Sequence, residues 1–199
     1  VSFVMLKKRA DGTPDETTVK VFMEPTDDIF TINQRINDII EKNSEPKHSN
    51  NTDKFAGFML SLPVLPYIVM ALVREMDRFG LLPRFIIDLS PFHTSMFITN
   101  LASINTRFIY HHTYEFGTTS VFICMGLPVA DFLNGDYSKK IMPLGVVMDE
   151  RICSGAVFSQ AFSLMKKYIH NASLLETAPE KILTETEMVI NTSDRQINA

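Results

Sequence analysis

Residues 148–155, M-D-E-R-I-C-S-G, bring together side chain types from which active sites are built. Cys153 could act as a nucleophile if Arg151 and the N-terminus of the following helix stabilised its thiolate. No histidine neighbours it in sequence, and a lone cysteine is usually a packing residue, so packing is the favoured interpretation. Ser154 stands where a helix cap belongs, and Asp149 with Arg151 could form an ion pair that fixes the turn.

Two adjacent histidines, His111 and His112, form the second group with chemical potential, and His93 precedes them. A structural role is the favoured interpretation, because one ring of such a pair can bond to the backbone while the other faces solvent. A catalytic base is the next alternative, and a metal ligand is the last. The chain has no HExxH or CxxC motif, no glycine-rich phosphate loop and no GxSxG, so we predict no metal site.

Composition restricts the class of protein. The 199 residues are 45% apolar and 21% charged, as in a globular chain of one domain. The net charge of −4, without any basic run, argues against a nucleic-acid partner. The only cysteines, Cys124 and Cys153, are too few for a disulfide framework. Reduced thiols and the absence of a visible signal peptide predict a cytoplasmic protein.

The N-terminal pattern predicts a hairpin and a helix. Residues 1–8 and 17–23 are strand-like, and the turn cluster at 10–15 joins them. Asp27 or Asp28 can cap a helix whose apolar positions are spaced for one buried stripe, namely Ile29, Ile32, Ile36, Ile39 and Ile40.

The run from Phe55 to Val73 contains no charged residue. Its length could span a bilayer, but Pro63 and Pro66 interrupt it and charged residues follow at once. A buried or interface-packed helix is favoured, a contact with a membrane surface is the second alternative, and a true span is the third. The sequence Gly-Leu-Leu-Pro at 80–83 predicts the end of this helix.

The C-terminal half is richer in strand signals. Strand-like runs lie at residues 96–100, 119–125 and 140–148, with Pro143 indicating an edge strand, and the last helix is predicted at 156–171. The order β-β-α-α-β-β-β-α predicts an α/β fold, an α+β sandwich in which helices cover a mixed sheet.

Three segments resemble a known family in the same chain order. Residues 95–104, S-M-F-I-T-N-L-A-S-I, are similar to the strand motif T-F-T-I-S-N-L-G-S-F, and 120–126, S-V-F-I-C-M-G, to A-I-L-G-V-G. Residues 142–155, M-P-L-G-V-V-M-D-E-R-I-C-S-G, are similar to M-P-L-T-L-S-F-D-H-R-V-I-D-G. These are motifs of the dihydrolipoamide acyltransferases of 2-oxo acid dehydrogenase complexes, which are relatives of chloramphenicol acetyltransferase.

The resemblance implies a chloramphenicol acetyltransferase-like mixed sheet flanked by helices over residues 1–175, and a C-terminal arm at 176–199. It implies that the N-terminal part of the family domain is absent before Val1. It also implies a homotrimer or an assembly of trimers, with active sites between subunits. Coenzyme A would be a substrate, and no tightly bound cofactor is expected.

The resemblance also assigns the site residues. The family's D-H-R-x-x-D-G turn carries the general base, a histidine that takes the thiol proton. Here Glu150 stands at that position and Ser154 replaces the motif's second aspartate, while the turn residues Asp149, Arg151 and Gly155 remain. Because a free glutamate has a pKa of about 4.3 and a thiol about 8.5, proton transfer to such a carboxylate costs about 6 kcal/mol.

The strand motif supplies the remaining candidates. Thr99 is the nearest match to the hydroxyl that supports the oxyanion, and Asn100 beside it, with Ser154, is a candidate for substrate binding. His111 or His112 could replace Glu150 as the base. We therefore expect either an acyltransferase that moves an acyl group from a thioester to an unknown acceptor, or a non-catalytic relative that serves as a trimeric scaffold or binding module. A protein held at a membrane surface by residues 55–73 is the third alternative.

Overall fold

The computed structural model describes residues 1–8, 12–44, 65–131 and 134–179. The chain forms two compact units. The first comprises residues 1–21 and 38–148, and the second comprises residues 22–37 and the chain from 149 onward. Helix α1, Ile29–Ser44, contributes to both units.

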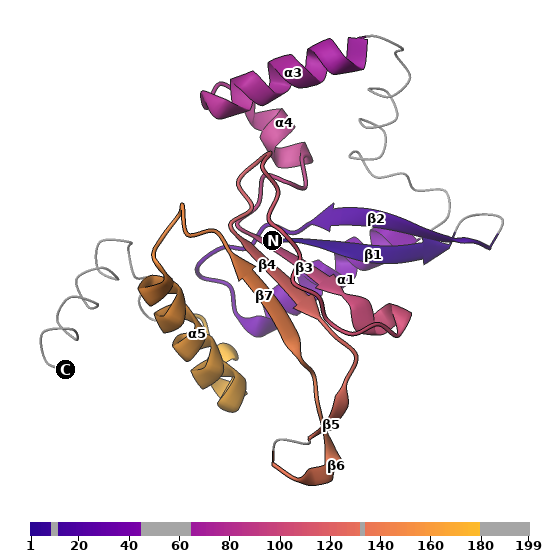
Figure 1. Cartoon of the computed structure of the whole chain (residues 1–199), viewed down its shortest axis with the longest axis vertical. Coiled ribbons are helices and arrows are strands. Elements are labelled where there is room, and N and C mark those ends of the chain that lie inside the picture. The colour runs from indigo at the N-terminus through magenta and orange to yellow at the C-terminus, as the bar shows by residue number, and fades with distance from the viewer. Residues whose placement is uncertain (9–11, 45–64, 132–133, 180–199) are drawn as a thin grey trace, which may run out of the picture. The chain divides into compact units, whose positions relative to one another are not determined.

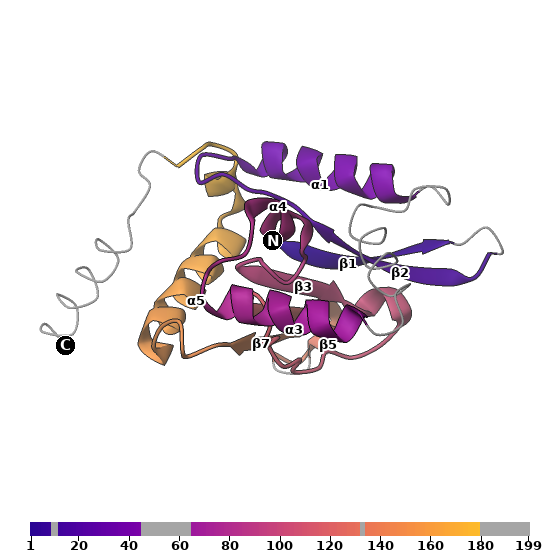
Figure 2. The ribbon, with the colours of Figure 1, turned by 90° about the horizontal axis from the view of Figure 1, so that it is seen from above.

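The first unit is built on a mixed sheet, which in the described part of the chain has five strands in the order β2-β1-β3-β4-β7 (Figure 1). β1 pairs with β2 and β4 with β7 in antiparallel fashion, whereas β3 is parallel to both β1 and β4 (Figure 2). This confirms the predicted mixed α/β class. The strands are β1 Ser2–Lys8, β2 Pro14–Lys20, β3 Met96–Asn100, β4 Val121–Met125 and β7 Leu144–Met148.

Aromatic residues form the centre of the sheet. Phe97 on β3 and Phe122 on β4 are direct cross-strand partners, and both are buried. Their rings stack with centroids 5.1 Å apart and an angle of 14° between planes. Cys124 follows Phe122 on the same face and is fully buried. Alternation along β4 therefore directs one face into the core, as the apolar pattern predicts.

The irregular segment 107–112 lies on this face of the sheet, as expected for a run that is extended without being a strand. The backbone N–H of Ile109 points at Cys124 Sγ, 3.5 Å away. At Gly145 a β-carbon would collide with the carbonyl oxygen of Ile109, and at Gly126 with the backbone nitrogen of Phe108. These two glycines let the segment lie directly against the strands.

Two helices and a second sheet lie at opposite ends of the first unit (Figure 1). α3, Leu65–Arg78, and α4, Arg84–Leu89, occupy one end, and β5, Val129–Asp131, pairs with β6, Asp136–Ile141, at the other. A short 3₁₀ turn, η1, covers Leu101–Ile104. The single strand predicted at 140–148 is wrong, because Pro143 separates β6 from the edge strand β7.

α3 ends as the sequence predicts. Gly80 has the left-handed φ of 66°, its N–H donates to the carbonyl of Asp77, and the N–H of Leu81 donates to that of Met76. These two bonds are those of a Schellman motif, which closes a helix at a glycine.

The apolar run that enters α3 is not buried in its described part. Tyr67, Ile68 and Leu72 are 82%, 63% and 59% exposed, so these side chains are not buried within the described part of the chain. The prediction of a buried or interface-packed helix over 55–73 therefore stays a prediction for its interface-packed form, and residues 55–64 lie outside the described residues. Among the described helices, none is both long and apolar enough to cross a membrane.

In the second unit, Asp28 caps α1 by accepting the N–H of Thr31 at 2.7 Å. The neighbouring Asp27 instead accepts a hydrogen bond from the guanidinium of Arg35 at 2.8 Å. Helix α5, Gly155–His170, is followed by the 3₁₀ turn η2, Ala172–Leu175.

The predicted apolar faces of these two helices are partly confirmed. In α1, Ile29 is exposed while the rest of the stripe, including residues that belong to the first unit, is half-buried. In α5, Phe158 is buried and Phe162 and Met165 are half-buried. Ile169 is 64% exposed, although its spacing places it on the same side of α5 as Phe162 and Met165.

The Gly145→Ala substitution should lower the free energy of unfolding by about 1–3 kcal/mol, because the added methyl group overlaps backbone and the ring of Phe108, 2.8 Å away. Urea denaturation measures this. Gly155→Ala is the control, since there the methyl group meets only the end of the flexible Glu150 side chain. If the two variants were equally stable, segment 107–112 would not be in close contact with β7.

Candidate functional site

The turn that follows β7 is held by the predicted ion pair. The guanidinium of Arg151 donates hydrogen bonds to the carboxylate of Asp149, from Nε to Oδ1 at 2.9 Å and from Nη2 to Oδ2 at 2.7 Å. The backbone N–H of Arg151 also donates to Asp149 Oδ1 at 3.0 Å. These hydrogen bonds from Arg151 to the carboxylate lower the pKa of Asp149 below its usual value.

Glu150 takes no part in this ion pair. Its side chain is exposed, and within the described chain it makes no hydrogen bond or ion pair. Ser154 occupies the N-cap position of α5, but its hydroxyl makes no capping bond, and its carbonyl accepts the N–H groups of Val157 and Phe158. The turn therefore keeps a rigid frame and presents a solvated carboxylate.

Thr99 and His111 share one face of the sheet in the first unit. Thr99 is the cross-strand partner of Cys124, so it lies on the face that carries Phe122. His111 stacks on Phe122 with centroids 4.1 Å apart and planes at 11°. Asn100 is used locally, because its side-chain oxygen accepts the N–H of Ala102 at 3.1 Å and caps η1.

The hydrogen bond of His111 fixes its tautomer. Its Nδ1 lies 2.7 Å from the backbone oxygen of His112. A carbonyl oxygen can only accept, so Nδ1 carries the proton and Nε2 keeps the lone pair of a base. His111 is half-buried and stacks on His112, which is exposed. The geometry of His111 is therefore compatible with both the predicted structural role and the alternative role of a base.

Sequence reasoning missed a buried network around Asp77 of α3. Asp77 Oδ1 accepts the Nε2–H of His93 at 2.9 Å, and Oδ2 accepts the N–H of Gly117 at 3.1 Å. Since the carboxylate fixes the His93 tautomer, the hydroxyl of Ser90 donates to Nδ1 at 2.8 Å. Gly117 is required here, because its φ is 89° and a β-carbon would collide with the carbonyl of Phe92.

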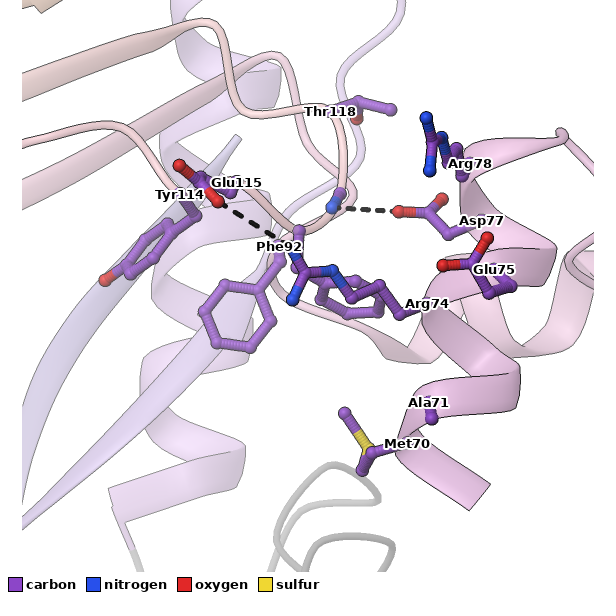
Figure 3. Close-up of a pocket in the computed structure, with 12 residues that line it drawn as sticks. Met70, Ala71, Arg74, Glu75, Asp77, Arg78, Phe92, Tyr114, Glu115 and Thr118 are labelled. Carbon is purple, nitrogen blue, oxygen red and sulfur yellow. Dashed lines mark hydrogen bonds and ion pairs between the residues drawn. The ribbon is translucent and has the colours of Figure 1, made fainter. Parts of the chain in front are cut away.

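A pocket of about 1130 Å³ opens beside this network (Figure 3). One wall comes from α3, with Arg74 and Arg78, and the other from Phe92 and the loop 114–118. In the sequence, the only indication of this pocket is an apolar helix that charged residues follow at once. That pattern predicts an amphipathic helix, but it does not indicate which loop lies opposite.

The predicted site residues divide between the two units. Thr99, Asn100, His111 and His112 belong to the first unit, whereas Asp149, Glu150, Arg151, Ser154 and Gly155 belong to the second. No group of three or more His, Cys, Asp or Glu that could hold a metal ion occurs among the described residues. No protein-family model matches the chain, and no curated protein matches it.

The Arg151→Gln substitution should raise the pKa of Asp149 toward about 3.9, the value of an unperturbed aspartate. The lowered pKa in the folded chain means that Asp149 adds stability above about pH 3.9, which is lost as the pH falls through the folded pKa. Arg151→Gln should weaken this dependence.

Carbon NMR titration of the aspartate carboxyl groups measures this change. Asp136, whose pKa is lowered by bonds from Ser138 and Lys139, is an internal control that should not move. The same Asp149 midpoint in both proteins would contradict the ion pair.

The Asp77→Ala substitution should lower the free energy of unfolding by at least about 2 kcal/mol, because it leaves the N–H groups of His93 and Gly117 without an acceptor. Asp77→Asn should cost less, since His93 can change tautomer and accept the amide. Asp88→Ala is the control, as Asp88 is exposed and its pair with Arg84, at 3.5 Å, lies at the surface. Urea denaturation would refute the network if both alanine variants were equally stable.

Proposed function

We propose that the protein transfers acyl groups from a thioester such as acyl-coenzyme A, as a divergent relative of the dihydrolipoamide acyltransferases with a chloramphenicol acetyltransferase-like form of the mixed sheet. The observation that carries the proposal is His111, whose Nδ1–H is engaged by a backbone carbonyl and whose Nε2 keeps its lone pair. Thr99 on the same sheet face supports it, because acyl transfer needs a hydroxyl donor as well as a base.

In the proposed reaction, Nε2 of His111 takes the proton from the acceptor as the acceptor attacks the thioester carbonyl. The hydroxyl of Thr99 donates to the oxyanion of the tetrahedral intermediate. When the intermediate collapses, the carbon–sulfur bond breaks, and coenzyme A leaves as a thiol with the proton returned by the imidazolium. The ring of Phe122 under His111 limits the rotation of the imidazole.

His111 is a better proposed base than Glu150 on general grounds. A free imidazole lies about two pKa units below a thiol, whereas a free carboxylate lies about four units below, so the imidazole saves about 3 kcal/mol. Glu150 is exposed and makes no hydrogen bond or ion pair within the described chain.

The second candidate is a trimeric scaffold or binding module of the same family without activity. The exposed, unpaired Glu150 favours it, since this residue stands where the resemblance expects the base. The retained ion pair of Asp149 and Arg151 fits both candidates, because it stabilises the turn with or without chemistry.

The test is turnover of acetyl-coenzyme A by the full chain, read as thiol release with a panel of amine, alcohol and thiol acceptors. His111→Gln should lower kcat/KM by about 100-fold or more, because it removes the proposed general base. His112→Gln is the matched control and should lower turnover far less, because it removes the stacked ring of His112 but keeps the backbone oxygen that accepts the Nδ1–H of His111.

Loss of turnover in Glu150→Gln alone would assign the base to Glu150 and overturn the role of His111. If the folded protein neither turns over acetyl-coenzyme A nor binds coenzyme A, the proposal of an enzyme is overturned and the scaffold is the remaining candidate.

A further inference from the structure

The residues that line the pocket beside α3 include none of the residues proposed for acyl transfer. Its volume of about 1130 Å³ is enough for a ligand of several hundred Å³, the usual range for small-molecule sites. The floor is apolar, with Met70 and Ala71 from α3 facing Phe92, Tyr114 and Phe116. Phe92 packs edge-on against Tyr114 and Phe116, which makes this floor rigid.

The position of this floor is fixed from behind. The bond from Gly117 N–H to Asp77 joins the loop to α3 (Figure 3). The carbonyl of Phe92 accepts both the N–H of Thr118 at 3.1 Å and the hydroxyl of Thr119 at 2.9 Å. The pocket therefore exists without a ligand, and binding needs little reorganisation of its walls.

Two guanidinium groups line the pocket above the apolar floor. Arg74 and Arg78 lie four residues apart, so they share one side of α3. Arg78 has no hydrogen-bond or ion-pair partner in the described chain. Arg74 meets Glu115 of the facing loop at 3.7 Å, with 69% and 83% of the two side chains exposed. Such an exposed pair contributes at most about 1 kcal/mol, so another carboxylate can replace Glu115 at low cost.

The acidic residues of the lining limit the charge of the ligand. Glu75, Asp77 and Glu115 line the pocket beside the two arginines. Asp77 is already satisfied by His93 and Gly117, which leaves two carboxylates against two guanidinium groups. A ligand with one negative charge that displaces Glu115 is compatible with this balance, whereas a dianion such as a phosphate monoester meets excess repulsion.

We propose that this pocket binds an aliphatic monocarboxylate of medium chain length. Its carboxylate pairs with Arg74 in place of Glu115, Arg78 adds a second positive charge on the same side of α3, and the aliphatic chain lies on Met70 and Phe92. The guanidinium groups supply charge-assisted hydrogen bonds, and the chain is removed from water against the aromatic floor. This inference is independent of acyl transfer, because it involves neither Thr99 nor His111.

The test is isothermal titration calorimetry of the full chain with dodecanoate below its micelle concentration. Dodecanoate should bind with one site, and the double variant Arg74→Gln and Arg78→Gln should bind it about tenfold more weakly or worse. Arg84→Gln is the matched control, since Arg84 is an exposed arginine outside the lining. Glu115→Gln should strengthen binding, because it removes the competing carboxylate.

Exposed apolar side chains of α3 could also attract an aliphatic chain, and two variants separate that surface from the pocket. Ala71→Phe fills the pocket and should abolish binding, whereas Leu72→Ala changes the outer face and should leave it unchanged. Circular dichroism verifies that each variant is folded. The proposal is overturned if dodecanoate does not bind, if the double arginine variant binds equally well, or if dodecyltrimethylammonium binds as tightly as dodecanoate.

Discussion

The stack of Phe97, Phe122 and His111 is the contact on which the geometry of the first unit depends. Phe122 stacks on a neighbouring strand through Phe97 and on an irregular segment through His111, with nearly parallel rings in both pairs. One aromatic side chain thus joins the sheet to the segment that carries the proposed base. Since Gly126 and Gly145 have no side chain, this segment can lie close enough for the rings to meet.

Features determined by neighbours in sequence could be predicted. The cap at Asp28, the helix end at Gly80 and the ion pair of Asp149 and Arg151 each involve residues within a few positions of one another, so the sequence pattern contains both partners. The mixed α/β class was also predictable, because alternation and helical periodicity give the order of elements.

Features determined by distant segments could not be predicted. Asp77 joins His93 and Gly117, which are 16 and 40 positions away, and nothing in the spacing of these residues indicates that they meet. Helical spacing places Ile169 on one side of α5 with Met165 without showing what covers that side, and Ile169 is exposed. For the same reason, the sequence could identify Thr99 and His111 as candidates but not their common sheet face.

Asp77 also determines which side chains α3 presents to its surroundings. Its carboxylate is fixed to two partners outside the helix, and its backbone carbonyl accepts the N–H of Gly80. The rotational phase of α3 is therefore set at its C-terminal end. One residue inserted between Arg74 and Asp77 would rotate the preceding part of α3 by about 100° about the helix axis. The side of the helix that carries Arg74 would then no longer face the pocket. A change of length before Leu65 would leave that phase intact.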